Sequence, residues 1–266
     1  MSEPAERSIT VEEAWALVDP ERWAEIHAIQ RAEQRARSAD DRLLGLNMLM
    51  HSWPDSRLGR RSGRVEVHGR VEEGLPAALV AALADLAEWL ESAELRSVYV
   101  GGVAVALVAR PRYTEDIDVL AVIPDDKLDR AVGLLPRFGL RLREPEFGLD
   151  MARRRGLLLL HHVHTEIDVD VLTAVSPFHE DVVHHATLVW VCGLKLHLPR
   201  PEDLIILKAF ANRGQDQIDI SYILDLCEDL DLARVRRIVG EVAVATATPE
   251  LLENLERLIA LAERPR

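Results

Sequence analysis

The stretch that decides the fold is VGGVAVALVARPRYTEDIDVLAV, residues 100–122. Two adjacent glycines, Gly101 and Gly102, precede a run of small apolar residues, and two carboxylates, Asp116 and Asp118, then stand one residue apart in an apolar segment. Successive side chains of a strand point to opposite faces, so the two aspartates project from the same face. Like charges this close repel one another unless a cation lies among them. What compensates these charges therefore determines what the segment does.

The same alternation recurs in EIDVDVL, residues 166–172. In a straight strand Glu166, Asp168 and Asp170 share one face, and the apolar residues between them share the other. Oxygen ligands of this kind suit a hard cation, Mg²⁺ or Mn²⁺. The alternative is that the carboxylates line a solvated face of a sheet and pair with arginine or lysine. Two such patterns downstream of one glycine turn favour the metal site.

The glycine pair suggests a second function for the same region. A strand that ends at Gly101 and Gly102 and opens a helix lets backbone N–H groups approach a phosphate with no Cβ in the way. Residues 103–115 leave room for a helix of about two to three turns and a return to the sheet. No lysine and hydroxyl residue follow at Walker A spacing, so this is not a P-loop. We expect a phosphate cradle and the carboxylates at the ends of adjacent strands.

Elsewhere, strand patterns alternate with helical patterns and then give way to a helical tail, which indicates an α/β (α+β) core with helical extensions. The basic, glycine-containing segment 57–64 is the best boundary in the chain. We therefore predict a helical N-terminal extension over residues 1–72, a core over residues 73–200 and a C-terminal helical region over residues 201–266.

Within the core, the pattern predicts helices over residues 75–95 and 125–139 and strands ending at Val100 and covering residues 115–123. Residues 157–173 form either one long strand or a hairpin that turns near Val163 to Thr165. The segment LVWVCGLKLHLP, residues 188–199, predicts a second hairpin with Gly193 at its turn.

Composition excludes several classes of protein. The formal net charge of −13 argues against strong, non-specific binding to nucleic acid. Two cysteines provide neither a disulfide framework nor a zinc-binding spacing. The N-terminus lacks a secretory signal, and the longest apolar run, residues 98–109, is shorter than the roughly 20 residues that cross a membrane. We expect a cytoplasmic protein without a membrane anchor.

Two motifs carry a resemblance to a known family. The glycine pair, then TEDIDV, then a later strand carboxylate resembles the nucleotidyltransferase superfamily of the DNA polymerase β type, and implies a small mixed β-sheet flanked by helices. The segment LHLPRPEDLIILKAFANRGQDQIDISYIL, residues 196–224, is similar to the region after the core in the bacterial AbiEii-type group, which includes toxins of toxin–antitoxin systems. The resemblance covers residues from about 95 to 228.

The resemblance implies a role for each carboxylate. Asp116 and Asp118 would bind two Mg²⁺ (or Mn²⁺) ions. Asp170 is the preferred third carboxylate because apolar residues and then Phe178 follow it, as is typical of the family, and Asp168 is the second choice.

It also implies a set of nucleotide contacts. Gly101, Gly102 and Thr114 would lie at the phosphates of a bound NTP, such as ATP, although many members have serine at the position of Gly102. Lys208 would project from a helix toward the triphosphate. Asp216 would either orient Lys208 or contact the nucleotide.

The activity implied is Mg²⁺-dependent transfer of NMP from an NTP co-substrate to an acceptor hydroxyl, with release of pyrophosphate. The acceptor is the 3′ end of tRNA, a protein or a small molecule, and the toxin group adds an antitoxin protein as a partner. Two alternatives stay open: a catalytically idle member that binds nucleotide or a partner, and a Mg²⁺-dependent phosphohydrolase. The reaction products distinguish these functions.

Overall fold

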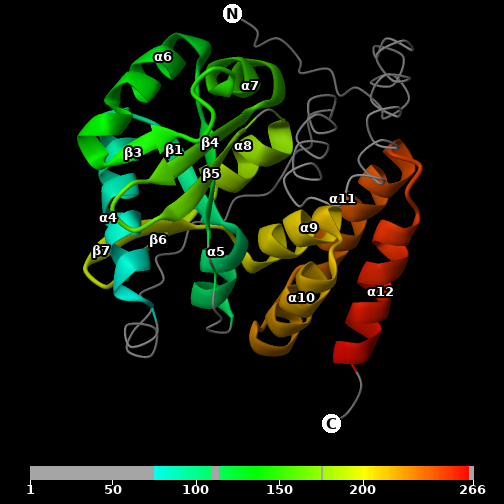
Figure 1. The fold of residues 1–266 in the computed structure, drawn as a ribbon. Helices are drawn as coiled ribbons and strands as arrows, with labels where there is room; N and C mark the ends of the chain where they lie inside the picture. Colours follow the sequence, from blue (N-terminus) through cyan, green and yellow to red (C-terminus); the bar gives the residue numbers. More distant parts are fainter. Residues whose placement is uncertain (1–74, 110–113, 115, 175, 264–266) are drawn as a thin grey trace, which may run out of the picture.

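The computed structural model describes residues 75–109, 114, 116–174 and 176–263, and Figure 1 shows two parts side by side. One part is a mixed five-stranded sheet with helices packed around it, and the other is a group of four C-terminal helices. The predicted α/β class is confirmed. The predicted N-terminal extension lies outside the described residues, and the proposed domain boundaries stay predictions.

The beginning of the core follows the sequence patterns closely. Helix α4 leads into β1, and the chain turns at the glycine pair into α5 before it returns as β2. The Trp89 indole in α4 is fully buried and donates a hydrogen bond of 2.9 Å to the Ala131 carbonyl oxygen, which ties α4 to α6. The bounds are α4 (Ala77–Ser92), β1 (Arg96–Val100), α5 (Gly101–Val108), β2 (Asp116–Val122) and α6 (Asp125–Leu134).

The middle of the core contains three elements that the sequence patterns did not predict. They are β3 (Leu140–Leu142), α7 (Gly148–Arg155) and α8 (Pro177–His184), and a 3₁₀ helix, η1 (Leu135–Phe138), precedes the first of them. Strand β3 has only three residues, too few to show a period. Helix α8 begins at a detectable N-cap, because the Ser176 hydroxyl accepts the His179 backbone N–H at 3.2 Å and Pro177 follows it.

Residues 157–173 form a hairpin and not one long strand. Strands β4 (Leu157–His162) and β5 (Ile167–Thr173) pair antiparallel around a turn at residues 163–166. Glu166 lies in that turn with a φ of 60°, so it does not continue the strand alternation of Asp168 and Asp170. The second predicted hairpin is confirmed as β6 (Thr187–Val191) and β7 (Leu194–Leu198), which form a separate two-stranded sheet.

The five-stranded sheet has the order β1-β2-β5-β4-β3, so two strands that are far apart in the chain become neighbours. Strand β2 pairs antiparallel with β1 and parallel with β5. In the parallel pair, Asp116 is the register partner of Asp168 and Asp118 is the register partner of Asp170. This register sets the geometry of the site.

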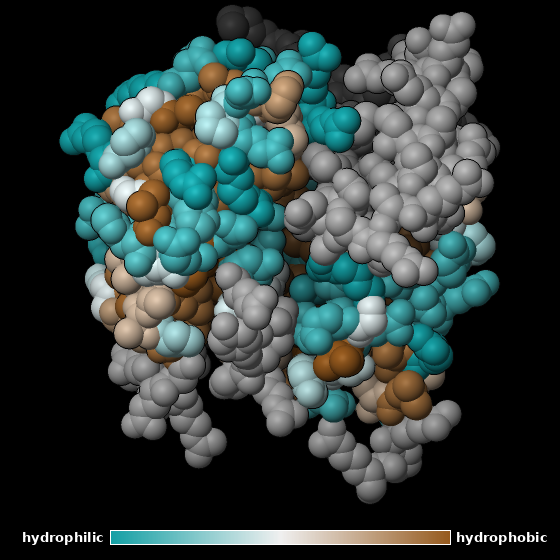
Figure 2. Space-filling model, viewed as in Figure 1, coloured by the Kyte–Doolittle hydropathy of each residue, from teal (hydrophilic) through white to brown (hydrophobic). Residues whose placement is uncertain are grey.

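The C-terminal region is helical, as predicted, and α9 packs against α5 of the core. Hydrophilic residues cover much of the visible face of the described parts, and hydrophobic residues are exposed there in smaller groups (Figure 2). Among the described residues no helix is long and apolar enough to cross a membrane. The four helices are α9 (Pro201–Ala211), α10 (Gly214–Leu226), α11 (Leu232–Ala245) and α12 (Glu250–Ala262).

Candidate active site

Four carboxylates gather on one face of the sheet where β2 lies beside β5. Register partners on neighbouring strands, and residues two apart on one strand, point to the same face, so the four aspartates form two adjacent pairs. Asp170 is buried with 5% of its surface exposed, whereas the Asp168 side chain is 42% exposed. The set is Asp116, Asp118, Asp168 and Asp170.

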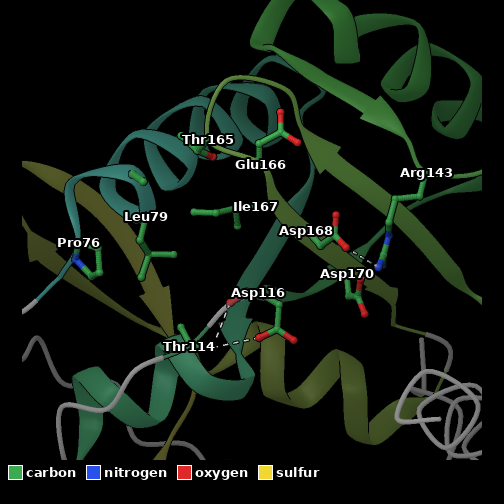
Figure 3. Close-up of a pocket in the computed structure, with 11 residues that line it drawn as sticks. Pro76, Leu79, Thr114, Asp116, Arg143, Thr165, Glu166, Ile167, Asp168 and Asp170 are labelled. Atoms are coloured by element: carbon green, nitrogen blue, oxygen red, sulfur yellow. Dashed lines mark hydrogen bonds and ion pairs between the residues drawn. The ribbon is translucent and has the colours of Figure 1, made fainter.

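A pocket of about 630 Å³ opens beside three of these carboxylates (Figure 3). Asp116, Asp168 and Asp170 line it together with Arg143 and with Glu166 from the hairpin turn. An apolar wall from the start of α4 and from β5 completes it, formed by Pro76, Ala78, Leu79 and Ile167. A pocket of this volume is large enough for a small-molecule ligand.

Asp118 points toward the glycine turn. Gly101 has a φ of 59°, and a Cβ built on it would lie 1.7 Å from Oδ2 of Asp118. The Gly102 backbone N–H donates a hydrogen bond to the Asp118 carboxylate. The missing Cβ, which the sequence suggested would admit a phosphate, admits the Asp118 carboxylate in this structure.

The environment of Asp118 disfavours the ionised form of its carboxyl group. Burial and, after it, the negative charge of Asp116 raise the pKa of Asp118 to about 6 from its ordinary value of 3.8. The positive charges of Lys208 and Arg213 and the Gly102 N–H oppose this rise only in part. A further cation beside Asp118 would therefore stabilise its ionised form.

Lys208 lies in a buried ionic cluster between α9 and α10. Its Nζ is 3.0 Å from Oδ1 of Asp216 and 3.0 Å from Oδ2 of Asp219, and both aspartates are fully buried. Arg213 donates to Asp216 through its Nε at 2.6 Å and its backbone N–H at 3.1 Å. Burial acts to raise the pKa of Asp216, but Arg213 and Lys208 together hold it below its ordinary value. Asp216 therefore contacts both Lys208 and Arg213, and its predicted role, to orient Lys208 or to contact the nucleotide, stays a prediction.

Thr114 orients Asp116. Its hydroxyl donates to Oδ1 of Asp116 at 3.0 Å and lies 3.2 Å from the Asp116 carbonyl oxygen, as drawn in Figure 3. It also lines the pocket, so it lies close to the space where a substrate would bind.

Arg143 is the residue of the site that the sequence patterns did not indicate. Its guanidinium is 3.2 Å from Oδ2 of Asp168 through Nη1 and pairs with Asp170 through Nη2. The His161 imidazole contacts the other oxygen of Asp168, with 2.7 Å between Nδ1 and Oδ1. Arg143 follows the short strand β3, and its local sequence RLREPEF carries no motif.

The donor chemistry fits a hard divalent cation, although the side chains do not converge on one point. The four carboxylates provide oxygen ligands on one face, and a bound cation would oppose the burial and the Asp116 charge that raise the pKa of Asp118. In the described part of the chain, however, no group of three or more His, Cys, Asp or Glu side chains is arranged to hold a metal. Asp168 and Asp170 instead pair with arginine, as the alternative interpretation of the sequence proposed.

A comparison with known protein families identifies the class of protein. Residues 77–257 match the family model described as "Nucleotidyltransferase of unknown function (DUF6036)", and the chain belongs to this family. The match runs from α4 into α12, so it includes both the sheet and the C-terminal helices. No curated protein matches the sequence.

Two solved structures resemble the chain distantly. One is the crystal structure of an antigenic nucleotidyltransferase-like protein from Paracoccidioides brasiliensis, with 15% identity and a TM-score of 0.39 over 69% of this chain and 91% of that chain. The other is the solution structure of the antibiotic-resistance factor ANT(2'')-Ia, with 15% identity and a TM-score of 0.37 over 70% of this chain and 96% of that chain.

Proposed function

We propose that this protein transfers a nucleotidyl group from an NTP to an acceptor hydroxyl and releases pyrophosphate. The observation that carries the proposal is the register of β2 and β5, which puts Asp118 beside Asp170 and next to the glycine turn. Membership of a nucleotidyltransferase family supports the reaction class. Asp116, Asp118 and Asp170 are the residues that we assign to Mg²⁺ or Mn²⁺.

A divalent cation in such a site stabilises the charge that develops on the attacking and leaving oxygens. Asp170 is the buried carboxylate next to the pocket, and it is the group that we assign to accept the proton of the attacking hydroxyl. Asp168, more exposed and held by His161 and Arg143, is assigned a supporting role.

Two positively charged residues of the C-terminal region act on the part of the site that contains Asp118 and the glycine turn. Lys208 and Arg213 both act on Asp118 through their charge. Asp216 and Asp219 hold the Lys208 ammonium in place. From that position its positive charge partly offsets the negative charge of Asp118, and we assign it to the side where the triphosphate would bind.

The pocket is the proposed entry of the acceptor. It lies at Asp168 and Asp170 and is lined neither by the glycine pair nor by Lys208, so acceptor and triphosphate would approach from different sides. Its volume of about 630 Å³ suits a small molecule or the terminal nucleotide of an RNA. The similarity to the AbiEii-type group favours the 3′ end of tRNA, with an antitoxin as partner, whereas the net charge of −13 favours an acceptor with few phosphates.

The test is transfer of label from each α-³²P NTP in the presence of Mg²⁺, with and without total tRNA. Asp118→Ala is expected to abolish transfer, and Asp126→Ala, an exposed carboxylate in the first turn of α6, is expected to retain it. Label on RNA or on protein, with pyrophosphate released, supports the transferase and identifies the acceptor class. Pyrophosphate release without labelled RNA or protein, in the presence of a metabolite extract, indicates a small-molecule acceptor.

Two results would replace the proposal with an alternative. Free NMP as the product in every condition indicates a phosphohydrolase that uses water. Mg²⁺-dependent NTP binding without turnover in any condition indicates an idle member of the fold.

A further inference from the structure

The third carboxylate already has a cation beside it, and that cation belongs to the chain. Arg143 pairs with Asp170, the buried carboxylate whose register partner is Asp118. A divalent cation bound at Asp118 and Asp170 would therefore lie close to the guanidinium, and the two positive charges would repel. Arg143 and a metal ion would therefore compete for the same carboxylate.

Arg143 would keep a partner if it left Asp170. The guanidinium spans two carboxylates, so it keeps Asp168 as a partner when it leaves Asp170. Asp168 is itself held by His161, with 2.7 Å between His161 Nδ1 and Asp168 Oδ1. A buried ion pair that loses one partner is normally destabilised strongly, and the second carboxylate removes most of that cost.

The Arg143 backbone is fixed, while its side chain has room to move. The Arg143 backbone N–H donates to the Leu159 carbonyl oxygen of β4 at 3.0 Å, which anchors the residue to the sheet. The side chain is 21% exposed and lines the pocket. Its Nε is buried without a hydrogen-bond partner within the described residues, so the guanidinium is not fully satisfied where it lies.

We propose that Arg143 is a displaceable counter-ion of the third carboxylate, which pairs with Asp170 until a divalent cation binds and then stays with Asp168. This inference rests on the proposed function, because it assumes that the carboxylates bind a metal. It makes Arg143 a positioning residue that offsets the negative charge of Asp170 and sets the affinity of the site for its cation. It also assigns Asp168 as the alternative partner of Arg143 and not as a ligand of the metal.

The test is Mn²⁺ binding to the full chain, measured by the electron paramagnetic resonance signal of free Mn²⁺, with and without a non-hydrolysable ATP analogue. Arg143→Gln is expected to bind Mn²⁺ about tenfold more tightly than the wild type. Arg143→Lys, which keeps the charge but cannot span both carboxylates, is expected to fall between the two, and it also serves if Arg143→Gln does not fold. Arg141→Gln removes an exposed arginine two residues away and is expected to leave the affinity unchanged.

A double variant separates the role of Asp168 from that of a metal ligand. On its own, Asp168→Asn is expected to weaken Mn²⁺ binding several-fold, because it leaves Arg143 with Asp170 as its one carboxylate partner of the two and so makes Arg143 harder to displace. In the Arg143→Gln background the same substitution is expected to cost clearly less. An equal or larger loss in that background would make Asp168 a ligand and overturn its role as the alternative partner.

The remaining outcomes distinguish this inference from the proposed function. If Mn²⁺ binds in a manner that depends on Asp118, and Arg143→Gln leaves the affinity equal or weaker, the inference is wrong and the proposed metal site stands. If neither the wild type nor any variant binds Mn²⁺, with or without nucleotide, the proposed function loses its metal site. The same conclusion follows if Asp118→Asn binds Mn²⁺ as tightly as the wild type. Unfolding midpoints of all variants show whether a change in affinity follows from a change in stability.

Discussion

Gly101→Ala tests the close approach between the glycine turn and Asp118. The added Cβ would lie 1.7 Å from Oδ2, 2.5 Å from Cγ and 2.7 Å from Cβ of Asp118, so the carboxylate has to move. The backbone φ of 59° adds a second cost, because a residue with a Cβ loses roughly 1–2 kcal/mol in this region. Overpacking typically costs about 1–3 kcal/mol more. We expect Gly101→Ala to lower the free energy of unfolding by about 2–5 kcal/mol.

Gly193→Ala is the matched control for this variant. Gly193 also has a positive φ, 78°, but a Cβ built there would meet no atom within 4 Å. It should therefore lose only the backbone cost of roughly 1–2 kcal/mol and keep its nucleotidyl transfer. Urea unfolding followed by circular dichroism gives both free energies, and the difference between them measures the contact with Asp118.

Equal losses of stability in the two glycine variants would refute the close approach. A second check combines Gly101→Ala with Asp118→Ala, which removes the two closest atoms, Oδ2 and Cγ, and leaves the Cβ. The contact predicts that Gly101→Ala costs clearly less in the Asp118→Ala background than in the wild type. An unchanged cost would show that the strain arises elsewhere in the turn.

Three further predictions concern stability. Because the pKa of Asp118 is about 6 in the folded chain against an ordinary 3.8, the free energy of unfolding of the wild type should fall by about 2 kcal/mol as the pH rises from 4 to 6 without metal; urea titrations should show a smaller loss for Asp118→Asn. Lys208→Met leaves Asp216 and Asp219 buried without their lysine and should cost about 3–5 kcal/mol; a loss below 1 kcal/mol in urea would contradict the buried cluster. His162→Phe removes a hydrogen bond of 2.8 Å to Asp85, which joins the hairpin to α4, and one of 2.6 Å to Thr165 within the hairpin, and it should cost about 1–3 kcal/mol; an unchanged melting temperature would contradict the link to α4.

Local sequence patterns predicted most of the elements because their causes are local. The period of two placed Asp116 and Asp118 on one face, and the glycine pair predicted the turn from strand to helix. The same patterns left residues 157–173 open between a strand and a hairpin, because the turn at residues 163–166 contains neither glycine nor proline. The structure resolves it as a hairpin.

The site itself depends on contacts between distant segments, and here the sequence was less informative. The preference for Asp170 over Asp168 came from a family pattern, whereas the structure adds that Asp170 is the buried register partner of Asp118. That register depends on a parallel pairing across several intervening elements. Arg143 reaches the carboxylates from a loop after a three-residue strand, and only the folded sheet brings them together.

The position of Lys208 and Arg213 has a consequence for the newly made chain. Synthesis proceeds from the N-terminus, so Asp116, Asp118 and Asp170 leave the ribosome before α9 and α10 exist. Until those helices dock, Asp118 lacks both cations that partly offset its burial and the charge of Asp116. The charges around this carboxyl group are therefore complete only after the C-terminal helices have been translated and have docked.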